Sequence, residues 1–352
     1  MEIVGTGSYL PGEPISNEQL AAVFGREVFW LCEMLGACHR HFAIDLDSLA
    51  LRPGETNADM ATKAAQRALL DAEVEPHSID LIVMATSTPD YPFPATALFV
   101  QEQLGIPSCT VMELRAGCSG MAQAFVIATH LLAAGTAHRA LLIGSELNSP
   151  FISLADRTDR GFEKDFLVSL AMFGDGAGAI VLSGDAERRG VLDCAAWSIS
   201  TGRPPGMILR TGGALAPGGY PRQDSSQAGE PIFHHDYQAI LTHAPELIVS
   251  ACDWLRDERG YDFSTVRYFI GPQASGHLID LTARQLDLPA ERVVSDFARA
   301  GNTVSASIYL ALDRLNQTGQ LHPDDRIVLL PAEATKWLYG AVGLRWTKGG
   351  KP

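Results

Sequence analysis

Cys118 is the residue in this chain whose type and position best suit covalent chemistry. It follows a short apolar run at residues 109–112 and Gly117, and Ser119 and Gly120 then open a helical pattern. A cysteine at a helix N-terminus is favoured as the thiolate, because the helix dipole and free amides stabilise the anion. The same amides can donate hydrogen bonds to an oxyanion that forms on a thioester carbonyl. We therefore expect Cys118 to carry an acyl group as a thioester. The simpler alternative is a buried cysteine in a tight turn.

Asn302 lies in a second copy of the motif that holds Cys118. Residues 115–118 read Arg-Ala-Gly-Cys, and residues 299–302 read Arg-Ala-Gly-Asn, 184 residues later in the chain. Two interpretations of Asn302 remain open and are compatible. Its side chain can cap the helix that follows, or it can polarise a group held on Cys118.

The elements around the two motifs repeat in the same order. Short apolar strands at residues 81–86 and 139–146 of the first half match strands at 268–271 and 326–333 of the second half. Strands that alternate with amphipathic helices predict parallel sheets covered on both faces. We expect a duplicated α-β-α-β-α body with halves 1–185, carrying Cys118, and 186–352, carrying Asn302. Sites in such folds gather at strand C-terminal ends, so the two residues should face each other across a pseudo-twofold axis.

Composition and charge exclude several classes of partner. The 352 residues are 46% hydrophobic and 19% charged, with 41 acidic against 27 basic side chains and a net charge of −14. A nucleic acid partner would need a basic face. The N-terminus lacks the pattern of a signal peptide, and no apolar run is long enough to span a bilayer. The six cysteines form no zinc-like cluster, so we expect a cytoplasmic protein with reduced thiols, no metal and no membrane partner.

Several stretches together resemble one enzyme family. The sequence is similar to the ketoacyl-acyl-carrier-protein synthase III family and its acyltransferase relatives in secondary metabolism, over nearly the whole chain. The resemblance implies a thiolase fold, a homodimer and a ping-pong reaction through a cysteine thioester. It also implies acyl-CoA or acyl-carrier-protein donors, with no cofactor besides the CoA or phosphopantetheine of the substrate. The matching stretches are 5–11 (Gly-Thr-Gly-Ser-Tyr-Leu-Pro), 40–43 (Arg-His-Phe-Ala), 85–89 (Ala-Thr-Ser-Thr-Pro), 173–178 (Phe-Gly-Asp-Gly-Ala-Gly) and 300–303 (Ala-Gly-Asn-Thr).

The resemblance assigns roles to individual residues. Cys118 falls on the family nucleophile and Asn302 on its active-site asparagine. Trp30 falls where the family stacks a tryptophan on the CoA adenine, although a core tryptophan would look the same. Phe93 matches a residue that reaches across the dimer interface. Arg160 lies in a charged segment and is a candidate contact for donor phosphates, with a solvated loop as the simpler interpretation.

Two departures from the family pattern change the expected chemistry. Pro272 stands where the family has its active-site histidine, and residues 333–338 (Glu-Ala-Thr-Lys-Trp-Leu) replace a glycine-rich run that helps form the oxyanion hole. Loss of one oxyanion donor costs roughly 3–4 kcal/mol in the transition state, so a decarboxylating condensation should slow. Acylation of Cys118 depends less on that donor. We therefore expect acyl transfer to a hydroxyl, an amine or a carrier; the alternatives are a decarboxylative Claisen condensation and a catalytically silent partner subunit.

A hydroxyl acceptor requires a general base within hydrogen-bond reach. His234 and His235 are candidates from a loop, where histidines are often only solvated. His277 is a candidate to swing toward the place of the missing histidine. Lys336 offers a positive charge in place of the missing donor, and a solvated surface lysine fits its position equally well.

Overall fold

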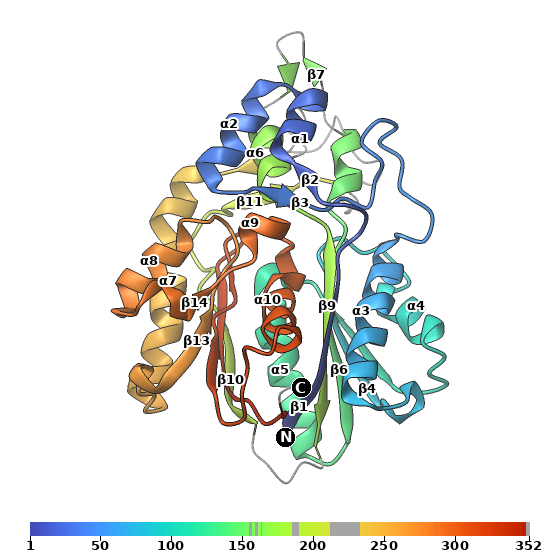
Figure 1. Ribbon diagram of the computed structural model, residues 1–352, viewed down its shortest axis with the longest axis vertical. Helices are drawn as coiled ribbons and strands as arrows, with labels where there is room; N and C mark the ends of the chain where they lie inside the picture. Colours follow the sequence, from blue (N-terminus) through green and yellow to red (C-terminus); the bar gives the residue numbers. More distant parts are fainter. Residues whose placement is uncertain (155–156, 159–160, 163, 185–189, 212–232, 350–352) are drawn as a thin grey trace.

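Two mixed β-sheets with the same strand order form the body of the molecule (Figure 1). The computed structural model describes residues 1–154, 157–158, 161–162, 164–184, 190–211 and 233–349. The first sheet has the order β1-β9-β6-β4-β5, and the second has the order β10-β17-β15-β13-β14, with β16 paired to β17. Each sheet is therefore built from one half of the chain. The α/β fold with its duplicated layers is confirmed.

The first sheet is parallel in its centre and antiparallel on one side. β4 pairs in parallel with β5 and β6, whereas β9 runs antiparallel to both β6 and β1. All five residues of β4 are buried and apolar, as expected for a strand covered on both faces. The strands are β1 (Glu2–Tyr9), β4 (Leu81–Ala85), β5 (Thr110–Leu114), β6 (Arg139–Glu146) and β9 (Gly176–Ser183).

The second sheet repeats these directions. β13 pairs in parallel with β14 and β15, and β17 runs antiparallel to β15 and β10. Strands matched in the sequence occupy equivalent places, β4 with β13 and β6 with β15, and β5 corresponds in position to β14. The strands are β10 (Val191–Ser198), β13 (Val266–Ile270), β14 (Val293–Val294), β15 (Arg326–Leu329), β16 (Ala332–Glu333) and β17 (Leu338–Arg345).

The expectation of purely parallel sheets is wrong, and the chain path explains why. β6 ends at Glu146, and the chain then builds part of the cap of the molecule before β9 begins at Gly176. Because β9 starts at the end of the sheet where β6 stopped, it must run back along β6. In the second half, β17 returns along β15 in the same way after a short turn through β16.

Helices form the outer and central layers. α5 and α10 lie between the two sheets, α3 and α4 cover the outer face of the first sheet, and α7 and α8 cover that of the second (Figure 1). The central core joins both sheets through side chains such as Phe125 of α5 and Leu312 of α10. The bounds are α3 (Asn57–Ala72), α4 (Thr96–Gln103), α5 (Gly120–Ala133), α7 (Tyr237–Asp253), α8 (Leu278–Leu286) and α10 (Ser307–Gln317).

A cap of short elements lies over one end of the layers (Figure 1). Its helices are α1 (Asn17–Phe24), α2 (Arg26–Leu35), α6 (Lys164–Met172) and α9 (Phe297–Ala300), and its strands are β2 (Ile15–Ser16), β3 (His39–Arg40), β7 (Arg157–Thr158), β8 (Gly161–Phe162), β11 (Met207–Leu209) and β12 (Phe233–His235). Short 3-10 turns and one π turn complete the described chain: Pro76–Ser78, Gly117–Ser119, Ser149–Leu154, Trp254–Glu258 (π), Phe263–Thr265, Ala290–Arg292 and Val304–Ala306. Within the described ranges, every helix is too short or too polar to cross a bilayer.

Candidate active site

Two equivalent turns carry Cys118 and Asn302. Gly117 has a φ of 49° and Gly301 a φ of 67°, a left-handed conformation that glycine adopts without steric cost. Cys118 then sits in the 3-10 turn that leads into α5, and Asn302 comes just before the 3-10 turn that leads into α10. The repeated Arg-Ala-Gly sequence thus places one side chain from each half at the entrance to a central helix.

Asn302 forms a hydrogen bond with the thiol of Cys118. The oxygen of its side chain is engaged by the turn that follows it in the chain. Its Oδ1 accepts hydrogen bonds from the Val304 N–H at 2.8 Å and from the Ser307 hydroxyl at 3.3 Å. Because the oxygen is held there, the amide NH₂ remains for Cys118. A hydrogen bond between Asn302 and Cys118 acts to lower the pKa of the thiol. Asn302 therefore serves both as a local cap and as a partner of the cysteine.

Glu333 is a site residue that the sequence reasoning missed. Its Oε2 accepts a hydrogen bond from the Cys118 N–H at 2.5 Å, and its Oε1 accepts one from the Thr335 N–H at 2.7 Å. The side chain is only 3% exposed. A Cβ added at Gly117 would lie 1.7 Å from Oε2, so the glycine makes room for the carboxylate.

The pKa of Cys118 is raised well above its ordinary value. Burial is the largest cause, followed by the negative charges of Glu333 and Glu146 and a hydrogen bond to Glu333, against which only the contact with Asn302 acts. The expectation that the helix N-terminus keeps Cys118 as a thiolate is therefore wrong for the enzyme without an acyl group. The amide expected to be free for an oxyanion donates to Glu333 instead. Cys118 is still partly accessible, as a nucleophile must be.

A second carboxylate, Glu146, also acts on Cys118 through its charge. Its Oε2 accepts from the Thr88 hydroxyl at 2.6 Å, and both its oxygens accept from the Ser87 N–H at 3.0 Å. Burial first, and the charge of Glu333 to a smaller extent, raise its pKa to about 7. Glu146 ends β6 and Glu333 ends β16, at matching places in the two halves. The repeat was the signal that could have revealed Glu333, because strands 139–146 and 326–333 both close on a glutamate.

Pro272, where the family resemblance places histidine, offers no donor to the site. It follows β13 by two residues. Its neighbour Gln273 does not compensate, because Gln273 Oε1 accepts from the Asp296 N–H at 2.6 Å and the Ser295 hydroxyl at 2.7 Å. Gln273 Nε2 donates to the Gly271 carbonyl at 2.8 Å.

The two loop histidines contact helix α6. His235 is buried, and its Nε2 lies 3.0 Å from the Ser169 hydroxyl. Burial lowers its pKa to about 4, so the ring is neutral at pH 7. His234 Nδ1 lies 3.5 Å from a carboxylate oxygen of Asp165, the same oxygen that accepts the His235 backbone N–H. The contacts described for this pair lead to α6 and not to Cys118.

Trp30 and His277 lie near each other on the surface. Trp30 on α2 is 65% exposed. His277 Nε2 lies 3.0 Å from the carbonyl of Met34, one helical turn after Trp30. This contact holds an exposed His277 against α2, away from the place where a substitute for the family histidine was expected.

Three other candidates are exposed or outside the described residues. Lys336 is exposed and donates to the Arg203 carbonyl at 2.5 Å. Phe93 is 86% exposed in the segment between β4 and α4. Arg160 lies outside the described residues.

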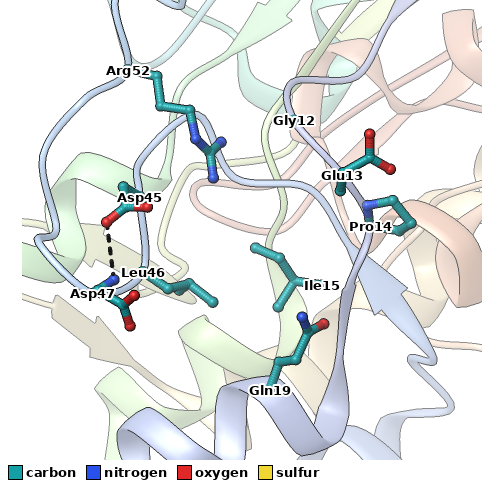
Figure 2. Close-up of a pocket in the computed structure, with 9 residues that line it drawn as sticks. All are labelled: Gly12, Glu13, Pro14, Ile15, Gln19, Asp45, Leu46, Asp47 and Arg52. Atoms are coloured by element: carbon teal, nitrogen blue, oxygen red, sulfur yellow. Dashed lines mark hydrogen bonds between the residues drawn. The ribbon is translucent and has the colours of Figure 1, made fainter.

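A surface hollow of about 360 Å³ lies at the cap, beside β2 and α1 (Figure 2). Arg52 points into the area but donates to the Phe42 carbonyl at 2.6 Å, and Asp45 accepts from the Asp47 N–H at 3.2 Å. No candidate residue of the site lines this hollow, so it carries no part of the proposed chemistry. It is lined by Gly12, Glu13, Pro14, Ile15, Gln19, Asp45, Leu46, Asp47 and Arg52.

The part of the chain that the structure describes contains no cluster of candidate metal ligands. No group of three or more histidine, cysteine, aspartate or glutamate side chains is arranged there to hold an ion. The site of Cys118 combines one thiol, one carboxamide and two carboxylates, which is the chemistry of acyl and proton transfer.

Comparison with known proteins agrees with this geometry. Residues 112–198 match the family described as 3-oxoacyl-[acyl-carrier-protein] synthase III, and residues 257–346 match its C-terminal domain. A β-ketoacyl-[acyl-carrier-protein] synthase III of Bradyrhizobium sp. (strain BTAi1) is 36% identical over 353 residues, which cover 98% of each chain. One of Rhizorhabdus wittichii is 33% identical, again over 98% of each chain.

Solved structures show the same likeness. The 3-oxoacyl-(acyl carrier protein) synthase III of Pseudomonas aeruginosa PAO1 superposes with a TM-score of 0.81 at 31% identity, covering 99% of each chain. A tetronic acid condensing enzyme, AbyA1, gives a TM-score of 0.81 at 30% identity, covering 98% of this chain and 100% of the other. A priming β-ketosynthase from the R1128 polyketide pathway gives a TM-score of 0.80 at 26% identity, covering 99% of this chain and 96% of the other.

Proposed function

This chain belongs to the 3-oxoacyl-[acyl-carrier-protein] synthase III family, and we propose that it is an acyltransferase that passes an acyl group from Cys118 to a hydroxyl, an amine or a carrier. Enzymes of this family act on thioesters of CoA or acyl-carrier protein and need no cofactor. In the proposed reaction, Cys118 takes the acyl group from such a thioester. In both half-reactions, Asn302 forms a hydrogen bond with the Cys118 sulfur.

One observation favours acyl transfer over a decarboxylating condensation. The Glu333 carboxylate is buried beside Cys118, with its Oε2 on the cysteine amide. A decarboxylating condensation develops an enolate at this place, and an adjacent carboxylate repels that charge in a site of low polarity. It also repels the carboxylate of a malonyl donor. Acyl transfer to a neutral hydroxyl or amine does not require an enolate.

The runner-up is a condensing enzyme. Its support is the printed name of the relatives, β-ketoacyl-[acyl-carrier-protein] synthase III, at 36% identity. Release of carbon dioxide from a malonyl thioester, dependent on Cys118, would favour this alternative over acyl transfer to a heteroatom.

The proposal also includes the type of metabolism and the oligomeric state. The structural likeness to a tetronic acid condensing enzyme and to a polyketide priming β-ketosynthase supports a place in secondary metabolism. We propose a cytoplasmic homodimer, in which the exposed Phe93 contacts the second copy. Trp30, exposed on α2, supports binding of the CoA adenine.

The proposal is tested by intact-protein mass spectrometry after incubation with acetyl-, butyryl- and malonyl-CoA and the matching acyl-carrier proteins. We expect a single acyl adduct on the wild type and none on Cys118→Ala. Cys38→Ala is the matched control, because Cys38 is an exposed thiol and its loss should leave the adduct unchanged. If no donor leaves an adduct, the ping-pong reaction is wrong and a silent partner subunit becomes the better hypothesis.

A further inference from the structure

The proposed transfer lacks a base in the positions where the sequence suggested one. The contacts described above hold His234 and His235 against α6, His277 against α2, and Lys336 against a surface carbonyl. An oxygen acceptor nevertheless has to lose a proton as it attacks the thioester. General base catalysis of such a step is worth about 10²–10⁴-fold in rate.

We propose that Glu333 is the general base that takes the proton from the acceptor hydroxyl or amine in the second half-reaction. This inference rests on the proposed acyl transfer through Cys118. The carboxylate contacts the reacting residue directly, since its Oε2 lies 2.5 Å from the Cys118 nitrogen. No other carboxylate is described in hydrogen-bond contact with Cys118.

The surroundings of Glu333 suit a proton acceptor. The Thr335 N–H holds Oε1 at 2.7 Å and fixes the orientation of the group. No lysine or arginine forms an ion pair with Glu333 within the described part of the chain. The carboxylate is thus buried without a cation to neutralise it.

Glu146 is less suited to this role. Its two oxygens are already held by the Ser87 N–H and the Thr88 hydroxyl. Glu333 contacts the Cys118 N–H directly, whereas Glu146 has no described hydrogen bond to Cys118. The contribution of Glu146 is the negative charge that it adds to the site.

Acylation changes what Glu333 can do. In the first half-reaction the Cys118 sulfur attacks the donor carbonyl, the bond to the CoA or phosphopantetheine sulfur breaks, and the thiol proton leaves with that sulfur. The new thioester oxygen then takes the Cys118 N–H in place of Glu333 Oε2. The displaced oxygen becomes free to accept a proton beside the thioester.

The second half-reaction uses this free oxygen. The acceptor O–H or N–H proton passes to Glu333 while the acceptor atom bonds to the acyl carbon. The bond between that carbon and the Cys118 sulfur breaks, and the proton on Glu333 returns to the sulfur. The site ends as it began, with a protonated thiol and an ionised Glu333.

The test separates the two half-reactions. Wild type, Glu333→Gln and Glu333→Asp are acylated with whichever of acetyl-, butyryl- or malonyl-CoA forms an adduct, free CoA is removed, and decay of the acyl-enzyme is followed by intact-protein mass spectrometry. The acyl-enzyme is challenged in parallel with water, glycerol and hydroxylamine. Hydroxylamine attacks thioesters without a general base and reports on an intact, accessible thioester.

We expect Glu333→Gln to acylate at least as fast as wild type and to discharge normally to hydroxylamine. Discharge to water and glycerol should slow by about 10²–10⁴-fold, and Glu333→Asp should restore part of it. Glu291→Gln, a surface control, should behave as wild type.

Discharge of Glu333→Gln to glycerol and water at the wild-type rate would overturn the proposal. Loss of acylation and of the hydroxylamine reaction together would show a structural role and would also overturn it. A wild type that forms no adduct overturns the acyltransferase function itself, and this inference with it.

Discussion

At the scale of single residues, two carboxylates act on one thiol and differ in what holds them. Glu146 is anchored by a backbone amide and a hydroxyl from the segment after β4, whereas Glu333 is held by the amides of Cys118 and Thr335. Both charges raise the pKa of Cys118. The resting enzyme therefore keeps its nucleophile protonated, and the acyl donor has to enter a site that disfavours anions.

The pH dependence of Cys118 alkylation follows from this charge pattern. Because only the thiolate reacts with iodoacetamide, the rate at Cys118 should be slow at neutral pH and still rise tenfold per pH unit beyond about pH 9. Glu333→Gln removes one of the charges that raise the pKa, so the profile should move to lower pH. Peptide mass spectrometry of Cys118 against the exposed Cys38 measures both curves. A Cys118 rate that has levelled off by neutral pH would contradict the raised pKa.

At the scale of elements, the turn between β5 and α5 is shaped around Glu333. Gly117 supplies both the left-handed backbone and the space for the carboxylate. The equivalent Gly301 supplies the left-handed backbone before Asn302. The same turn thus gives a nucleophile in one half and a carboxamide in the other.

Gly117→Ala should disturb this turn in two ways. A residue with a Cβ in the left-handed region costs about 1–2 kcal/mol, and the new methyl group would also meet Glu333 Oε2. We expect a lower thermal midpoint and loss of acylation. In the double variant Gly117→Ala/Glu333→Ala the clash is absent, so the combined loss of stability should be smaller than the sum of the single effects. Additive losses would show that the two residues do not contact each other.

The sequence predicted the repeated elements well because each strand is a short apolar run followed by a helix. The paired order of the two sheets and the meeting of Cys118 with Asn302 both follow from that repeat. Sequence reasoning failed for properties that depend on contacts between residues far apart in the chain. The ionisation of Cys118 depends on Glu333, 215 residues away in the chain, and no local helix rule includes that charge. The antiparallel direction of β9 likewise depends on where the chain re-enters the sheet after it has formed part of the cap.

At the scale of the whole molecule, one exposed apolar segment runs from Tyr91 into α4. Phe93 is 86% exposed, with Tyr91 at 56% and Leu98 at 45% nearby in the sequence. Aromatic side chains that anchor an interface account for much of its binding energy. This segment supports the proposed homodimer.

Phe93→Ser should weaken that dimer. Loss of a buried aromatic anchor typically costs 2 kcal/mol or more, about a thirtyfold rise in the dissociation constant. Sedimentation equilibrium over a range of concentrations measures the change, and Val23→Ser, an exposed apolar residue on α1, is the matched control. A wild type that is monomeric throughout, or a Phe93→Ser variant that dimerises as tightly as wild type, would contradict the assigned interface.

The hydrogen bond between Glu333 and the Cys118 amide also bears on covalent inhibitors. Drug-like electrophiles that depend on a reactive thiolate would meet a protonated sulfur here, and those with an acidic warhead would be repelled by two carboxylates. We expect such compounds to spare this enzyme at doses that inactivate a synthase with an ionised cysteine. In a cell that holds both enzymes, such a compound would block the synthase and leave the proposed acyl transfer through Cys118 intact.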